Sequence, residues 1–101
     1  MEIIKWLEKW YRQQCDGEWE HEYTVHIETL GNPGWSVKIS VMYTDLENVQ
    51  LEVDDTERSE DDWFFYRIKD GEYFATGDPD KLQFLLEKFK EIAEQHDQSR
   101  S

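Results

Sequence analysis

The sequence feature that most constrains the fold is a turn at residues 31–35, Gly-Asn-Pro-Gly-Trp. Proline fixes φ at the second position of a β-turn and glycine supplies positive φ at the third, so Asn32–Trp35 predicts a type II turn. On both sides of it, over residues 23–29 and 35–41, apolar and polar residues alternate. Alternation with a period of two is typical of strands that have one buried face, so a hairpin is predicted here.

The register of this hairpin follows from its apolar residues. Residues directly opposite each other share a face of the sheet, so the apolar sides meet only if Ile27 lies opposite Val37. The same register places Val25 opposite Ile39. It leaves residues 30–34 as a five-residue loop.

Helices are predicted at both ends of the chain. Over residues 2–14 the apolar side chains fall on one side of a helical wheel. Residues 15–21 form the predicted connection into the first strand. Near the other end, Asp78 and Pro79 provide an N-cap and a first-turn proline for a helix whose apolar residues extend from 82 to 93.

Three further strands are predicted between the hairpin and the second helix, at residues 49–54, 63–69 and 72–76. The dipeptide Asp70-Gly71 is typical of a type I′ turn that joins the last two strands. Pairing across this turn places apolar side chains on both faces: Tyr66, Ile68, Tyr73 and Ala75 on one, and Trp63, Phe65 and Phe74 on the other. The second of these faces is then either covered by a helix or open to a partner.

The resulting order is α-β-β-β-β-β-α. With mostly short connections, it predicts an α+β fold with an antiparallel five-stranded sheet and helices on one face. Residues 1–101 are interpreted as a single domain, with a frayed polar tail at 97–101.

Composition and charge narrow the class of partner. The chain has 24 acidic residues against 11 basic ones, a formal net charge of −13. This charge repels phosphate backbones and anionic lipids, so no nucleic acid or membrane partner is expected, and a basic protein is the natural complement. Cys15 is the only cysteine, and no signal peptide or membrane-spanning run is visible. We therefore expect a cytoplasmic protein that is a monomer when free.

Several uncommon runs occur in order along the chain: Trp6-Leu7, Trp10-Tyr11, Cys15-Asp16-Gly17, Trp19-Glu20-His21, residues 32–39 and residues 57–63. Together, from about Ile4 to Phe89, they resemble immunity protein family 53, which belongs to bacterial polymorphic toxin systems. The resemblance implies an antidote that binds and neutralises a cognate toxin domain in the producing cell or its kin. It does not identify the toxin or the contact residues.

An acidic run is the candidate contact surface. Between Asp45 and Asp62 there are nine acidic residues and one base, Arg58. One interpretation is a solvated rim that blunts a sheet edge. The other is a surface complementary to a basic toxin, for example a nuclease with a Lys- and Arg-lined channel. In the second case the predicted toxin-binding residues are Asp54, Asp55, Glu57, Glu60, Asp61, Asp62, Trp63, Phe65 and Trp19.

The roles of two residues stay open, Arg58 within the acidic run and Trp19 within the predicted set. Arg58 has an alternative role in tying the loop internally through a carboxylate pair. Trp19 lies in a polar loop and is either a packing lid or a partner contact. By contrast, Trp6, Trp10 and Trp35 are predicted to be core residues because they fall in apolar series.

An enzyme that uses the thiol of Cys15 is the alternative function, and a non-catalytic structural adaptor is a third. A nucleophilic cysteine needs nearby cations or a helix N-terminus. Cys15 instead follows a helix and is flanked by Asp16 and Glu18, so an inert or packing role is favoured.

No catalytic, metal or cofactor site is predicted. The spacing of Cys15, His21 and His26 matches no standard zinc ligand pattern. His21 and His26 would point to opposite faces of one continuous strand, with His26 on the solvent face.

Overall fold

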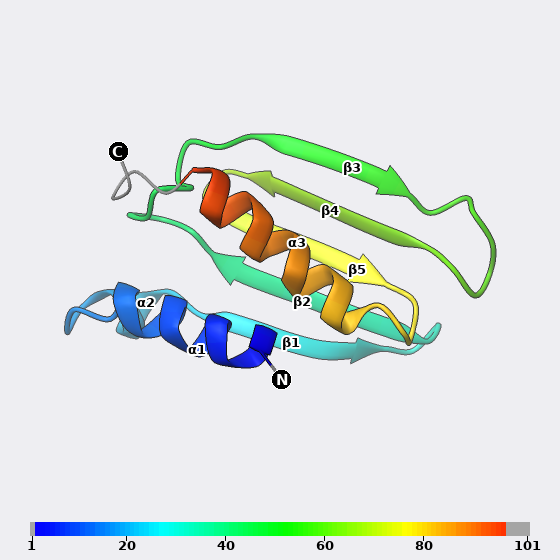
Figure 1. The fold of residues 1–101 in the computed structure, drawn as a ribbon, viewed down its shortest axis with the longest axis horizontal. Helices are drawn as coiled ribbons and strands as arrows, with labels where there is room; N and C mark the ends of the chain where they lie inside the picture. Colours follow the sequence, from blue (N-terminus) through cyan, green and yellow to red (C-terminus); the bar gives the residue numbers. More distant parts are fainter. Residues whose placement is uncertain (1, 97–101) are drawn as a thin grey trace.

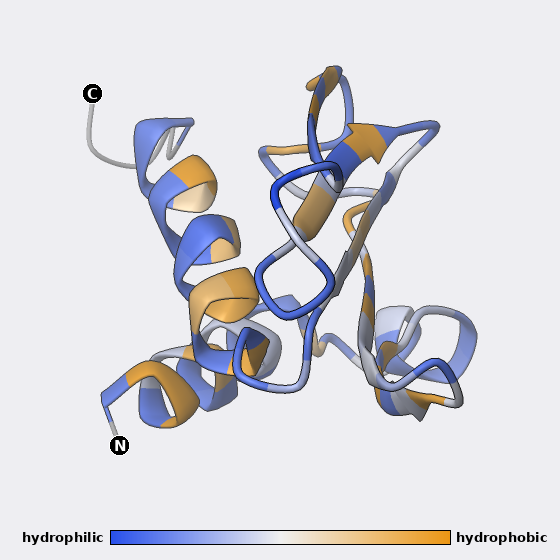
Figure 2. Ribbon diagram, turned by 90° about the vertical axis from the view of Figure 1, so that its right-hand side faces the viewer, coloured by the Kyte–Doolittle hydropathy of each residue, from blue (hydrophilic) through white to orange (hydrophobic). Residues whose placement is uncertain are grey.

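Five strands form one antiparallel sheet, and two long helices pack on one of its faces (Figures 1 and 2). The computed structural model describes residues 2–96, so the tail predicted at 97–101 lies outside the described residues. The elements are α1 (Glu2–Gln14), α2 (Trp19–Glu22), β1 (Val25–Leu30), β2 (Gly34–Ser40), β3 (Leu51–Asp55), β4 (Phe64–Lys69), β5 (Glu72–Gly77) and α3 (Leu82–Gln95). The predicted α+β class is confirmed, and the one-turn helix α2 is an addition to the prediction.

The strand order in the sheet is β1-β2-β5-β4-β3. β5 therefore occupies the centre, between β2 and β4, although it is the last strand in the sequence. β1 and β3 form the two edges (Figure 1).

The predicted register of the first hairpin is confirmed, with Ile27 opposite Val37. Pairing continues to Leu30 and Gly34, so the loop has three residues instead of five. Gly34 does not have positive φ, and the predicted type II turn is therefore wrong. This position is glycine for another reason, since a Cβ there would overlap the carbonyl oxygen of Gly77 on the neighbouring strand.

The second predicted turn is confirmed. Asp70 and Gly71 have φ values of 55° and 77°, as a type I′ turn requires. The turn sets Ile68 opposite Tyr73 on the face that the helices cover. Both side chains are fully buried.

The other face of the sheet carries no helix among residues 2–96 (Figure 2). The rings of Phe65 and Phe74 meet there at 6.1 Å between centroids. The guanidinium of Arg67 lies over both rings, 5.8 Å and 5.3 Å from their centroids. This arrangement leaves both aromatic rings half-buried beneath a cation.

The core is centred on Phe89 of α3. Its ring contacts Trp6, Trp10 and Tyr73 at centroid distances of 5.9, 4.9 and 5.0 Å. Trp19 is also a core residue, 5 % exposed, and its indole N–H donates to the carbonyl of Met42 at 2.8 Å. The predicted packing of the two α1 tryptophans is confirmed, and Trp19 is a packing residue, not a surface contact.

The start of α3 corrects the prediction. Asp78 is not the N-cap, because the helix begins at Leu82 with Lys81 in the N-cap position. Asp78 instead begins a separate turn, in which its carbonyl accepts from the N–H of Lys81 at 3.0 Å. Its carboxylate is directed toward β4, where the candidate site lies.

Candidate functional site

The strand order brings together two loops that lie far apart in the sequence. Gly77 of β5 pairs with Trp35 on one side and Phe64 on the other. The segments that precede these two residues, the 31–33 turn and the acidic loop (residues 56–63), therefore lie side by side. Between them lies a hollow of about 890 Å³ that is open to solvent. It is lined by Asn32, Pro33, Thr56, Glu57, Ser59, Glu60, Asp61 and Trp63.

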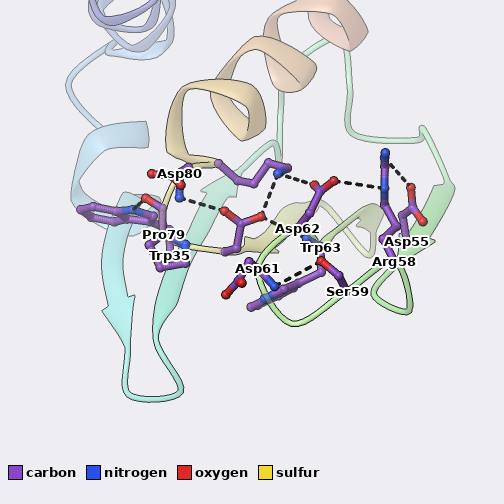
Figure 3. Close-up of polar contacts among 11 residues, drawn as sticks. Trp35, Asp55, Arg58, Ser59, Asp61, Asp62, Trp63, Pro79 and Asp80 are labelled. Atoms are coloured by element: carbon purple, nitrogen blue, oxygen red, sulfur yellow. Dashed lines mark hydrogen bonds and ion pairs between the residues drawn. The ribbon is translucent and has the colours of Figure 1, made fainter.

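A chain of ion pairs fastens the acidic loop to the sheet (Figure 3). Lys81 contacts Asp78 and Asp62, each with a nitrogen–oxygen distance of 2.7 Å. Asp62 in turn contacts Arg58 at 3.5 Å, and Arg58 contacts Asp55 at 3.2 Å. Arg58 thus has the internal, structural role that was one of its two interpretations.

The inner end of this chain is buried and the outer end is exposed. Asp78 is fully buried, and its carboxylate also accepts from the backbone N–H groups of Trp63 (3.0 Å) and Asp80 (2.9 Å). Burial acts to raise the pKa of Asp78, but the hydrogen bonds from Lys81 and these two N–H groups outweigh it and hold the pKa below its ordinary value. The hydrogen bond from Lys81 likewise lowers the pKa of Asp62. The hydrogen bond to Asp62, and after it the one to Asp78, are the largest causes that raise the pKa of Lys81.

The carboxylates that remain available differ from the predicted set. Asp55 and Asp62 are held by cations, and Asp54 accepts from the N–H and hydroxyl of Thr56 at 3.1 and 2.8 Å. Three exposed carboxylates in the described part of the chain carry no ion pair and line the hollow: Glu57, Glu60 and Asp61. The hollow therefore carries uncompensated negative charge.

The three aromatic residues of the predicted set lie in different parts of the molecule. Trp63 lines the hollow, and its backbone is fixed by two hydrogen bonds to Asp78. Phe65 lies outside the hollow, on the face without helices. Trp19 is in the core. Sequence reasoning missed Asn32 and Pro33, because only the central position of β5 brings their turn to the acidic loop. It also passed over Thr56 and Ser59, which lie among the predicted acidic residues.

The thiol and imidazole groups show structural contacts. The thiol of Cys15 donates to the carbonyl of Tyr11 in the preceding helical turn, at 3.3 Å. His26 is exposed, as predicted, and lies 3.5 Å from Glu28. Across residues 2–96 no three His, Cys, Asp or Glu side chains form a group suited to a metal ion.

The hollow is open and its walls are charged as well as aromatic, unlike the mostly apolar pockets that hold small ligands. A sequence model of the family described as immunity protein 53 matches residues 4–94. The chain belongs to the immunity protein 53 family. Membership implies a non-catalytic inhibitor that neutralises a toxin.

Two further comparisons gave no result. Neither a curated protein nor a solved structure shows a significant match to the chain. Between residues 2 and 96, no helix combines the length and the apolar character that crossing a membrane requires.

Proposed function

We propose that the protein neutralises its cognate toxin by stoichiometric binding in the cytoplasm, with the hollow as the contact surface. The observation that carries the proposal is the gathering of three unpaired carboxylates, Glu57, Glu60 and Asp61, beside Trp63. In this arrangement the bound protein occludes the active site or substrate channel of the toxin.

The charge of the hollow favours a basic partner. Carboxylates that have no internal cation keep their full attraction for Lys and Arg groups, which accelerates encounter. A half-buried tryptophan beside them supplies the apolar anchor that interfaces use to hold a complex. A nuclease is the toxin class that fits best, because the carboxylates would compete with nucleic acid phosphates for the same basic groups.

The ion pairs decide which substitutions test this proposal. Replacing Asp62 would disturb its contacts with Lys81 and Arg58, so its effect on binding would be mixed with an effect on the loop. Glu57, Glu60 and Asp61 can be reversed without breaking an ion pair between described residues.

The test is the triple variant E57K/E60K/D61K, measured against a catalytically inactive form of the toxin domain encoded beside this chain. We expect association to slow about tenfold or more and to become less sensitive to salt. Surface plasmon resonance at several ionic strengths gives the rates. Survival of cells that co-express the active toxin gives the functional consequence.

The matched control is E18K/E72K/E94K, which makes the same change in net charge. All three residues are exposed. They lie between α1 and α2, at the start of β5 and near the end of α3, and these element ends are at the end of the molecule opposite the acidic loop (Figure 1). If the effect is local to the hollow, the control should change the association rate much less than the triple variant does. Equal association rates for the two triple variants would contradict the proposed surface.

A further inference from the structure

The outer side of β1 is an open sheet edge whose free backbone groups can be assigned. The carbonyl of Thr24 accepts from the N–H of Ser40 at 3.0 Å, which makes these two residues a hydrogen-bonded pair. Bonded and non-bonded positions alternate along an antiparallel pair, so the even-numbered residues of β1 bond to β2. The N–H and C=O groups that point away from β2 belong to the odd-numbered residues, Val25, Ile27 and Thr29.

An apolar groove of about 470 Å³ lies beside this edge, between β1, α1 and α2. Its apolar lining consists of Ile4, Leu7, Tyr11, Tyr23, Val25 and Ile27. Ile4, Tyr11 and Ile27 are 38–39 % exposed, a high value for large apolar side chains that lie together. Val25 and Ile27 thus have both features: their side chains line the groove, and their backbone N–H and C=O groups point away from β2.

The other edge of the sheet is protected and this one is not. β3 has three acidic residues in five, Glu52, Asp54 and Asp55, and charge of this kind prevents a further strand from pairing. β1 has a single carboxylate, Glu28, in six residues. An unguarded edge next to an apolar groove is suited to the addition of a strand.

We propose that a strand of the toxin domain pairs with the outer edge of β1 and places alternate apolar side chains in the groove. This inference rests on the proposed function only in taking the toxin as the partner. Backbone hydrogen bonds to Val25, Ile27 and Thr29 supply affinity, and the groove selects every second side chain.

Charge complementarity identifies the occupant. The carboxylates of Glu8 and Glu20 also line the groove, and Glu28 lies on the strand itself, so the added strand carries Lys or Arg between or beside its apolar residues. A second copy of this chain fits less well, because it would bring the same carboxylates and a second charge of −13 to the edge. β1 also leads directly into the 31–33 turn, so one partner can reach both the groove and the hollow.

The test is residue-resolved amide hydrogen exchange by NMR, on the unmodified protein alone and with the inactive toxin domain. In the free protein the amides of Val25, Ile27 and Thr29 should exchange rapidly, while those of His26 and Glu28 are protected by β2. In the complex the first three should slow at least about tenfold. This alternating pattern distinguishes strand addition from general shielding of the surface.

The substitution Ile27→Lys supplies a second measurement. A lysine at this position places a cation in the groove, and we expect the toxin affinity to fall about tenfold or more. His26→Lys adds the same charge one residue away on the opposite face, and it should leave the affinity within about twofold. The two variants separate occupation of the groove from a general effect of charge.

The possible results discriminate between the two proposals. A complex in which the three odd-numbered amides still exchange rapidly overturns strand addition and leaves the proposed function standing. Protection of these amides in the free protein that rises with concentration identifies a second copy as the occupant and also overturns the proposal. Absence of any complex removes the proposed function and this inference with it.

Discussion

At the scale of single residues, Asp78 does the most to position the candidate site. It is fully buried directly after β5, and it binds the N–H of Trp63, the N–H of Asp80 and the ammonium of Lys81. If the carboxylate were removed, the two N–H groups would lose their acceptor and Lys81 would keep only Asp62. One side chain therefore connects the start of β4, the end of β5 and the turn that leads into α3.

The substitution Asp78→Asn tests this role. It removes the negative charge beside Lys81 and turns one acceptor into a donor, so we expect a loss of about 2 kcal/mol in the free energy of unfolding at pH 7. Denaturation by urea, followed by tryptophan fluorescence, measures the loss. Asp61→Asn is the control, because its carboxylate has no ion pair within residues 2–96, and it should leave the midpoint unchanged.

The pH dependence of this difference has a defined sign. A carboxylate with a lowered pKa contributes stability above its unfolded pKa of about 3.9, and the contribution is lost as pH falls through the folded value. The gap between the natural protein and Asp78→Asn should therefore be full at pH 6 and shrink below about pH 4. A gap that stays constant down to pH 2 would show that the charge of Asp78 is not responsible.

At the scale of elements, the close approach of β2 and β5 places the two loops of the hollow together. Gly34 begins β2 at the point where the carbonyl of Gly77 leaves no room for a Cβ. The obstacle is backbone, which cannot move aside as the end of a flexible side chain can. The separation of these strands, and with it the distance between the 31–33 turn and the acidic loop, depends on this glycine.

We predict that Gly34→Ala destabilises the protein by about 1–3 kcal/mol, because the added methyl group forces the two strands apart. Gly31→Ala is the matched control: it lies three residues earlier, has no atom within 4 Å of an added Cβ and does not have positive φ. Its stability should be unchanged or slightly higher. Thermal melts of the two variants compare them directly, and equal melting temperatures would show that the strands tolerate the methyl group.

At the scale of the whole molecule, both long helices and the sheet share one core around Phe89. α1 reaches this core through Trp6 and Trp10, and the sheet reaches it through Tyr73, whose hydroxyl donates to the carbonyl of Leu85 at 2.7 Å. Burial raises the pKa of Tyr73. Because all layers meet at one side chain, they are expected to unfold together.

The variant Phe89→Ala should lose about 3–5 kcal/mol of stability and still unfold in a single transition. Far-UV circular dichroism and tryptophan fluorescence should give the same midpoint. Phe84→Ala, at a half-buried position of the same helix, should cost less. Two separate midpoints for Phe89→Ala would mean that α1 is held independently of α3 and the sheet.

Much of this architecture could be predicted from the sequence, because it depends on local patterns. Alternation fixed the register of Ile27 with Val37, and Asp70-Gly71 predicted its turn type. The site could be predicted only in part. The acidic loop and Trp63 are contiguous in sequence, whereas Pro33 joins them through the position of β5, and Asp78 binds Trp63 across 15 residues. Contacts of this kind depend on the order of strands, which periodicity does not encode.

Ion pairs from Asp78 to Asp55 hold the acidic loop in place before any partner arrives. A loop without such restraints would lose conformational entropy on docking, about 1–2 kcal/mol for each residue that becomes fixed. The fastened loop has already undergone most of this ordering during folding, so more of the contact free energy remains for binding. The surface is preorganised, and we expect rigid-body capture of the toxin without a folding step.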